Sequence, residues 1–227
     1  MQIEPASDSS VLVRFGESIS TAFFHEVMGL FRALKALDDP RIRNFHPAYA
    51  SLSIDFDPLR MSFREIESMM ESAVRLARET PLETNLVRIP VCYDPEFGPD
   101  LDFIAEGCGI PPAEVVRLHS HAAYIVHFLG FSPGFGYLGG LPEQLEVPRL
   151  ETPRKHVPAG SVGIAGKQTG IYPVDSPGGW RLIGRTPLRM FNPLRNPPTK
   201  LQPGDAVQFV AIDRANFDEV AKSESSR

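Results

Sequence analysis

Three groups of residues in this sequence have the types and spacing of known chemical sites. They are a G-x-G-x-x-G run at residues 134–139, a P-loop-like run at residues 161–168, and the histidines His119, His121 and His127. A G-x-G-x-x-G run binds a dinucleotide only where it opens a helix, because the helix N-terminus holds the pyrophosphate. Pro142 and Pro148 follow this run without a helical pattern, so we predict tight-turn glycines in a loop.

The P-loop pattern G-x-x-x-x-G-K-[ST] is broken at both ends in residues 161–168. Ser161 replaces the first glycine, and Gln168 replaces the final hydroxyl residue. Without that hydroxyl the loop lacks its magnesium ligand, and no helix is predicted to follow it. If the protein works with ATP, we expect the nucleotide site to lie elsewhere, on another chain.

The histidines suggest zinc, which prefers imidazole ligands. His119 and His121 would share one face of an extended segment, and His127 follows six residues later. No Asp or Glu lies at ligand spacing among them. We therefore predict polar histidines at a helix-to-strand junction and no metal site. Neither a serine nor a cysteine stands in a nucleophile elbow of the form G-x-S-x-G.

The composition is typical of a soluble globular protein. Of 227 residues, 42% are hydrophobic and 22% are charged, and the net charge of −5 argues against a nucleic-acid coat or a basic membrane-surface protein. The N-terminus does not have the pattern of a signal peptide. The longest nearly apolar run, residues 122–131, is far shorter than the ~20 residues of a membrane helix. The chain has two cysteines, Cys92 and Cys108, and a single disulfide bond would do little to stabilise a chain of this length. The sequence therefore favours a reduced, cytoplasmic setting.

Proline and glycine divide the chain into two parts. Residues 1–80 hold 4 of the 22 prolines and 2 of the 18 glycines. Because both residue types mark turns, we predict long regular elements in the first part and a turn-rich β structure in the rest. The expected division is an α+β domain at residues 1–84, a mainly β domain at 85–220 and a frayed tail at 221–227.

The first part predicts the order β-α-β-β-α-β of a ferredoxin-like sandwich. We expect strands at residues 11–15, 42–49, 51–56 and 85–91, one helix capped by Ser20, and another begun by an S-x-x-E capping box at residues 62–65. Two short helices, at residues 100–108 and 112–118, are expected next. Short strands separated by Gly and Pro then indicate a closed or nearly closed antiparallel barrel.

Residues 119–191 carry a distinctive string of motifs. It includes F-L-G-F-S-P-G-F at residues 128–135, V-P-A-G-S-V-G-I at 157–164, Q-T-G-I-Y-P at 168–173 and P-G-G-W at 177–180. This string resembles the family of the 5-oxoprolinase B subunit, also called allophanate hydrolase subunit 1-like or sporulation-kinase-inhibitor-like proteins. The resemblance covers nearly all of residues 85–211, and the first part of the chain agrees in pattern rather than in motif.

The resemblance implies an α+β N-terminal domain followed by a cyclophilin-like β-barrel. It also implies a reaction, the ATP-driven opening of 5-oxo-L-proline to L-glutamate. Two partners are implied. One is the C subunit, which is biotin-dependent carboxyltransferase-like and would form a heterodimer with this chain, and the other is the A subunit. ATP and magnesium would be bound mainly by another subunit, so this chain alone is expected to be inactive.

The implied chemistry suggests catalytic roles for polar residues of the motifs. A lactam resists water, and phosphorylation of its carbonyl oxygen would make the carbon electrophilic, so the site must stabilise a developing oxyanion. His119 is expected to transfer protons near neutral pH, unless it caps the preceding helix. Gln168 presents an amide donor and acceptor that match a lactam, or it holds its own glycine loop. Thr169 would donate to the substrate carbonyl or occupy a turn.

Three further residues are expected to bind the substrate. Arg154 would pair bidentately with the substrate carboxylate, unless it forms a structural or inter-subunit ion pair. Phe135 and Trp180 would form the walls of a ring pocket, since flat rings pack well on aromatic faces. Trp180 would otherwise be an anchor of the core or of an interface. Lys167 and Arg185 stand beside these motifs without an assigned role.

Proteins with two other functions have the same motif string. One branch of the family inhibits a sensor histidine kinase, and in that case the barrel would bind a helix of the kinase. The other function is that of one component of an allophanate- or urea-degrading hydrolase. The residues quoted above do not separate these functions from the 5-oxoprolinase, because all three would use the same barrel.

Overall fold

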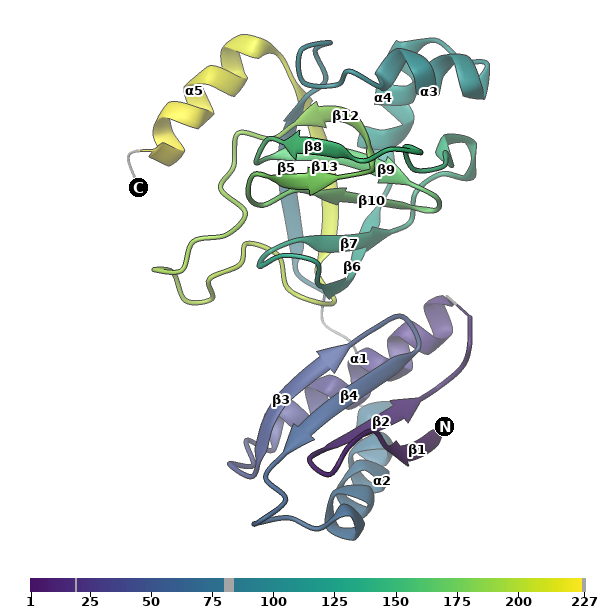
Figure 1. The fold of residues 1–227 in the computed structure, drawn as a ribbon, viewed down its shortest axis with the longest axis vertical. Helices are drawn as coiled ribbons and strands as arrows, with labels where there is room; N and C mark the ends of the chain where they lie inside the picture. Colours follow the sequence, from purple (N-terminus) through teal and green to yellow (C-terminus); the bar gives the residue numbers. More distant parts are fainter. Residues whose placement is uncertain (19, 80–83, 226–227) are drawn as a thin grey trace. The chain divides into compact units, whose positions relative to one another are not determined.

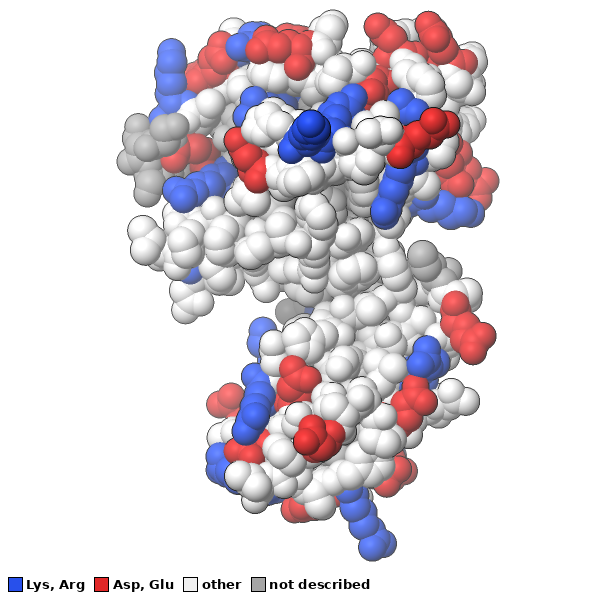
Figure 2. Space-filling model, viewed as in Figure 1, with Lys and Arg blue, Asp and Glu red and all other residues white. Residues whose placement is uncertain are grey.

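The computed structural model describes residues 1–18, 20–79 and 84–225. The chain divides into two compact units, Met1–Thr84 and Asn85–Arg227, each with its own hydrophobic core (Figure 1). In the described part of the chain, no helix has the length and apolar character needed to cross a membrane. Figure 2 shows Lys and Arg mixed with Asp and Glu over the visible face of both units, so this face has no extended field of one sign.

The N-terminal unit is a four-stranded antiparallel sheet packed against two helices. The strand order is β1-β2-β4-β3, with β1 (Gln2–Pro5), β2 (Ser10–Arg14), β3 (Ile42–Pro47) and β4 (Ser51–Phe56), and the helices are α1 (Thr21–Ala36) and α2 (Phe63–Glu79). Alternate residues of β2 and β4, such as Val13 and Leu52, are fully buried against apolar side chains of both helices, such as Leu30 and Ile66.

The predicted ferredoxin-like order is wrong at one strand. The strand expected at residues 85–91 exists as β5 (Leu86–Cys92), but it pairs with β12 and β13 in the C-terminal unit. The fourth strand of the N-terminal sheet is instead β1, so the order in this unit is β-β-α-β-β-α. Buried residues alternate in β5, and such alternation shows that a face is buried without showing which core buries it.

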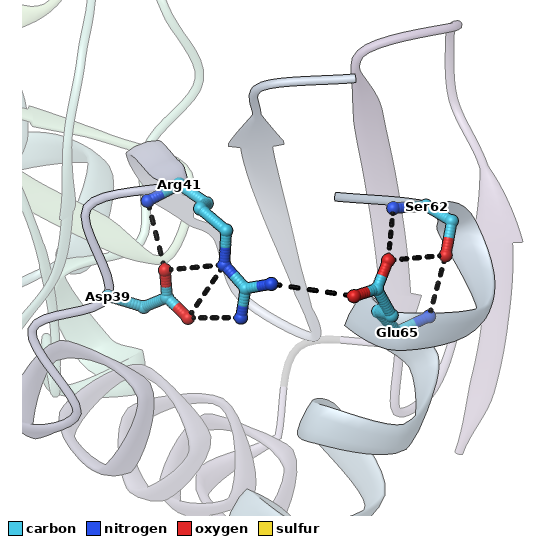
Figure 3. A network of polar contacts seen from close by, with 4 residues as sticks. All are labelled: Asp39, Arg41, Ser62 and Glu65. Carbon is cyan, nitrogen blue, oxygen red and sulfur yellow. Dashed lines mark hydrogen bonds and ion pairs between the residues drawn. The ribbon is translucent and has the colours of Figure 1, made fainter. Parts of the chain in front are cut away.

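Helix α2 begins at the predicted capping box. The Glu65 carboxylate accepts hydrogen bonds from the backbone N–H of Ser62 at 2.8 Å and from its hydroxyl at 2.7 Å (Figure 3). These bonds hold the pKa of Glu65 below its usual range. Arg41 lies between Glu65 and Asp39, 3.5 Å from the first carboxylate and 2.7 Å from the second, so one network joins the start of β3 to the start of α2.

The C-terminal unit is built on a closed barrel, as predicted. In the described part of the chain its strands follow the order β10-β7-β6-β13-β5-β12-β9. Besides β5, the barrel strands are β6 (Tyr124–Leu129), β7 (Gly136–Gly139), β9 (Ser161–Ala165), β10 (Gln168–Ile171), β12 (Arg181–Arg185) and β13 (Ala206–Ile212). The barrel differs from the predicted antiparallel one at a single pair, because β5 and β13 run parallel.

Two further strands, three helices and a 3₁₀ turn are described in this unit. They are the paired strands β8 (Arg154–Val157) and β11 (Ser176–Gly178), the helices α3 (Leu101–Cys108), α4 (Pro112–His121) and α5 (Arg214–Ser225), and the 3₁₀ turn η1 (Glu143–Leu145). The tail expected to fray from residue 221 is helical as far as Ser225, and residues 226–227 lie outside the described residues. Phe217 anchors this helix, with its ring centroid 4.6 Å from that of Phe97.

The first nucleotide-like motif is only in part the loop of tight-turn glycines that its context predicts, because Gly134 lies in a turn with φ of 88° but the residues after it form a strand. Residues 136–139 form β7, which leads to the 3₁₀ turn rather than to an α-helix. Residues 161–168 form β9, a turn and the start of β10, which pair as an antiparallel hairpin. Neither segment opens a helix that would hold a phosphate.

Candidate functional site

His119 lies in the core of the C-terminal unit. Its ring is fully buried and stacks on Phe209, with the ring centroids 4.5 Å apart. Nδ1 lies 2.8 Å from the Tyr93 hydroxyl, and Nε2 lies 3.0 Å from Oγ1 of Thr169. The Thr169 hydroxyl donates to the carbonyl of Gly163 at 3.0 Å. Both ring nitrogens therefore have protein partners, and no part of the ring is exposed to a substrate.

These contacts determine the protonation state of His119. Because Thr169 gives its hydrogen to Gly163, Nε2 of His119 donates to Thr169, and Nδ1 accepts from Tyr93. Burial disfavours the imidazolium ion and lowers the pKa of His119 to about 3. This geometry contradicts the predicted proton transfer by His119 and the predicted donation from Thr169 to a substrate. Both residues belong to a hydrogen-bonded chain that joins α4 to the β9–β10 hairpin.

Arg154 pairs with a carboxylate of this chain. Its guanidinium lies 2.8 Å from Oδ1 of Asp100 and donates to the carbonyl of Trp180 at 3.4 Å. The other Asp100 oxygen accepts from the backbone N–H of Leu182 at 2.6 Å. The structural ion pair left open by the sequence is thus present, in place of the predicted contact with a substrate carboxylate. It joins β8 to α3 and β12.

Phe135 and Trp180 meet in a buried aromatic cluster. Their rings pack edge to face with centroids 5.3 Å apart, and Tyr137 and Tyr172 contact the same Phe135 ring. Phe135 is 2% exposed and Trp180 is 5% exposed. The structure therefore brings the two predicted ring-binding residues together, but as a core rather than as the walls of an open pocket.

Gln168, like Arg154, is a predicted site residue that the core does not enclose. It begins β10, opposite Ala165 in the β9–β10 hairpin, and it is half-buried. Its neighbour Thr169 points into the buried His119 chain. Because successive side chains of a strand point to opposite faces, Gln168 lies on the other face of the hairpin. Its pairing with a lactam amide stays a prediction.

The ends of several motifs surround a cleft in the C-terminal unit, with a volume of about 720 Å³. Its walls come from the segment between β8 and β9, the segments that follow β10 and β12, and one face of α5. Gly160 forms backbone hydrogen bonds to two of the other segments that line the cleft. Its N–H donates to the carbonyl of Tyr172 at 2.7 Å, and its carbonyl accepts from the N–H of Thr186 at 2.9 Å.

The cleft contains charged residues to which the sequence analysis gave no role. Arg185, Arg189, Asp175 and Glu224 all line it. Arg185 belongs to the motif string, but a single sequence does not show that segments near residues 160, 173 and 224 converge on it. The sequence does place Arg185 between Gly184 and Thr186, at the end of a predicted strand. Loops at strand ends are common places for binding residues.

The P-loop-like segment does not fit a phosphate site. It is a β-hairpin, without the helix N-terminus that would receive a phosphate. Among the described residues, no three His, Cys, Asp or Glu side chains lie close enough to hold a metal ion.

Comparison with known proteins identifies the family. Residues 1–201 match the family model of the carboxyltransferase domain, subdomain C and D. The chain is 40% identical over 234 residues to the 5-oxoprolinase B subunit of Bacillus subtilis, and the match covers 95% of each chain. It is 37% identical to the 5-oxoprolinase B subunit of Haemophilus influenzae, over 92% of this chain and 97% of that one.

A solved structure shares the fold. The urea carboxylase of Kluyveromyces lactis superposes with a TM-score of 0.74 at 19% identity, over 98% of this chain and 22% of that one. At this identity the likeness concerns the fold alone, and it shows the same architecture as part of a much longer chain. Together, the family model and the full-length relatives show that this chain belongs to the family of the 5-oxoprolinase B subunit.

Proposed function

We propose that this chain is the B subunit of an ATP-dependent 5-oxoprolinase, an amide hydrolase that opens 5-oxo-L-proline to L-glutamate. The observation that carries the proposal is the 40% identity to a 5-oxoprolinase B subunit along 95% of both chains. The cleft of about 720 Å³ adds support, because it has room for a small polar ring. ATP and magnesium are assigned mainly to another subunit, and the complex is assigned to the cytoplasm.

The partners in this proposal are the C subunit, as the other half of a heterodimer, and the A subunit. Two exposed apolar side chains of the C-terminal unit support contact with another chain. Phe131 is 62% exposed on a backbone with φ of 64°, and Leu194 is 93% exposed. A large residue rarely adopts this left-handed conformation, and exposed apolar groups are common at protein interfaces.

Reconstitution tests the proposal. Glutamate release from 5-oxo-L-proline and ATP is measured with this chain alone, with only the A and C subunits, and with all three. We expect turnover only in the complete mixture. Turnover without this chain would contradict the proposal. An assembled mixture that releases no glutamate would also contradict it, and would favour an allophanate or urea substrate or inhibition of a sensor kinase.

Gln168 does not line the cleft, because it begins β10 at the turn of the β9–β10 hairpin and the cleft lies beyond the other end of that strand. It is therefore proposed as the alternative to the cleft, a separate place where the lactam would be bound within the assembled enzyme. We expect Gln168→Ala to lower the turnover number about 100-fold or more, because the loss of one aligned donor to a developing oxyanion has an effect of this size. Gel filtration should show that the complex still assembles. Gln144→Ala, at an exposed position of the 3₁₀ turn, is the control and should keep full turnover. Normal turnover in Gln168→Ala would remove this residue from the site.

A further inference from the structure

Arg185 is a half-buried arginine in the cleft, and among the described residues no carboxylate forms an ion pair with it. Its hydrogen bond within the described chain runs from Nε to the carbonyl of Ala159 at 2.8 Å. Its guanidinium also lies 5.8 Å from the centroid of the Phe97 ring. By contrast, Arg154 in the same unit has Asp100 as its partner. A half-buried cation without a carboxylate partner attracts anions, so Arg185 is the candidate anion-binding group of the cleft.

The bond to Ala159 also orients the guanidinium of Arg185. This group is planar and its N–H donors have a fixed geometry. When Nε is held by a backbone carbonyl, the donors on the two Nη atoms stay available for a ligand. Two parallel N–H groups match the two oxygens of a carboxylate, and such bidentate pairs are among the strong hydrogen bonds of proteins.

Other charged groups of the cleft are consistent with this assignment. Arg189 donates through Nε to the carbonyl of Phe191 at 3.2 Å, so a second guanidinium is held in a similar way. Asp175 accepts from the backbone N–H of Ala159 at 2.7 Å. Glu224 accepts from the backbone N–H of Arg189 at 3.3 Å and lies 3.9 Å from Arg195. Neither carboxylate forms an ion pair with Arg185.

We propose that the cleft binds a small carboxylic acid whose carboxylate pairs with the Nη atoms of Arg185, while Arg189 adds a second positive charge. The neighbouring side chains of Pro173 and Leu188 give the acid apolar walls. The identity of the acid rests on the proposed function, which makes it 5-oxo-L-proline or the product L-glutamate. A phosphate group has a similar geometry, so the experiment must separate a carboxylic acid from a nucleotide.

Calorimetric titration of the full chain tests binding without requiring turnover. The probes are 5-oxo-L-proline, L-glutamate, ATP, and 2-pyrrolidinone, which is the same lactam without the carboxylate. We expect binding of 5-oxo-L-proline or L-glutamate that weakens about 10- to 100-fold in Arg185→Gln, the range of a lost charge-assisted hydrogen bond. Arg185→Lys should keep part of the affinity, and 2-pyrrolidinone should not bind. Trp180 emission checks that each variant is folded.

The control variant is Arg117→Gln, at an exposed position of α4 where the arginine pairs with Glu114. It should bind as the wild-type chain does. Equal affinity of the folded wild-type and Arg185→Gln chains for both acids would overturn the proposal, and so would loss of ATP binding alone. In the reconstituted enzyme, Arg185→Gln should raise KM for 5-oxo-L-proline with a smaller effect on kcat.

The two proposals fail in different ways. If the complete mixture releases no glutamate but Arg185→Gln still loses affinity for a carboxylic acid, the cleft assignment stands and the reaction is a different one. If the mixture turns over normally with Arg185→Gln and with an unchanged KM, the 5-oxoprolinase assignment stands and the cleft assignment is wrong.

Discussion

Replacing Gly160 with alanine is expected to lower the free energy of unfolding of the C-terminal unit by roughly 3 kcal/mol or more. The backbone of Gly160 has φ of 82°, and an added Cβ would lie 2.4 Å from the carbonyl oxygen of Thr186. The segment has little freedom to move aside, because Gly160 is hydrogen-bonded to Tyr172 on one side and to Thr186 on the other. The same displacement would distort the cleft that Gly160 lines.

Denaturant unfolding followed by tryptophan fluorescence measures this effect. The chain has one Trp, and Trp180 lies in the buried cluster of the C-terminal unit, so its emission reports on that unit. Gly107→Ala is the matched control, because Gly107 lies in α3 and an added Cβ there would meet nothing within 4 Å. That variant should be up to about 1 kcal/mol more stable than the wild type. Coincident unfolding curves for Gly160→Ala and wild type would contradict the prediction.

Acidification is expected to destabilise the C-terminal unit through His119. Its pKa is about 3 in the folded chain, against an ordinary value of 6.5. As the pH falls below 6.5 the unfolded chain takes up a proton and the folded chain does not, so stability is complete above this pH and declines toward pH 3. The full effect of one such group is up to about 5 kcal/mol. His127, whose pKa burial lowers to about 4, acts in the same direction.

The variant His119→Gln separates this contribution. It should be less stable than wild type at pH 7, because the hydrogen bonds to Tyr93 and Thr169 are altered, but its stability should fall less steeply between pH 6.5 and 3. Urea unfolding at a series of pH values, followed by Trp180 emission, gives both slopes. His121→Gln changes an exposed histidine of the same helix and should keep the wild-type slope. Equal slopes for His119→Gln and wild type would show that this ring does not govern acid sensitivity.

Much of the fold was predictable from local patterns. The capping box at Ser62 and Glu65 forms as expected, since its hydrogen bonds join residues three apart. The short strands bounded by Gly and Pro do form a barrel. The assignment of residues 85–91 failed because strand pairing is a long-range property. The partner of β5 is β13, and an alternating pattern does not identify a partner so distant in sequence.

The candidate site was less predictable, for a related reason. His119 and Thr169 were singled out for chemistry by their residue types, but the buried acceptors and donors around them come from Tyr93 and Gly163. The sequence does not distinguish a buried polar side chain whose hydrogen bonds are made within the protein from one that binds a substrate. Arg185 shows the reverse case, because the cleft for which we propose it as the anion-binding group forms only when distant segments are brought together.

The parallel pairing of β5 with β13 has a consequence for biosynthesis. The barrel closes between its first strand and its last, and these strands pair along seven residues, from Leu86 beside Ala206 to Cys92 beside Ile212. A ribosome therefore releases the whole N-terminal unit long before the barrel can close. Until β13 emerges, β5 and β6 both present open edges, which are templates for aggregation. Chains that stop at residue 201, where the family match ends, would keep the motif string and lack the strand that closes the barrel.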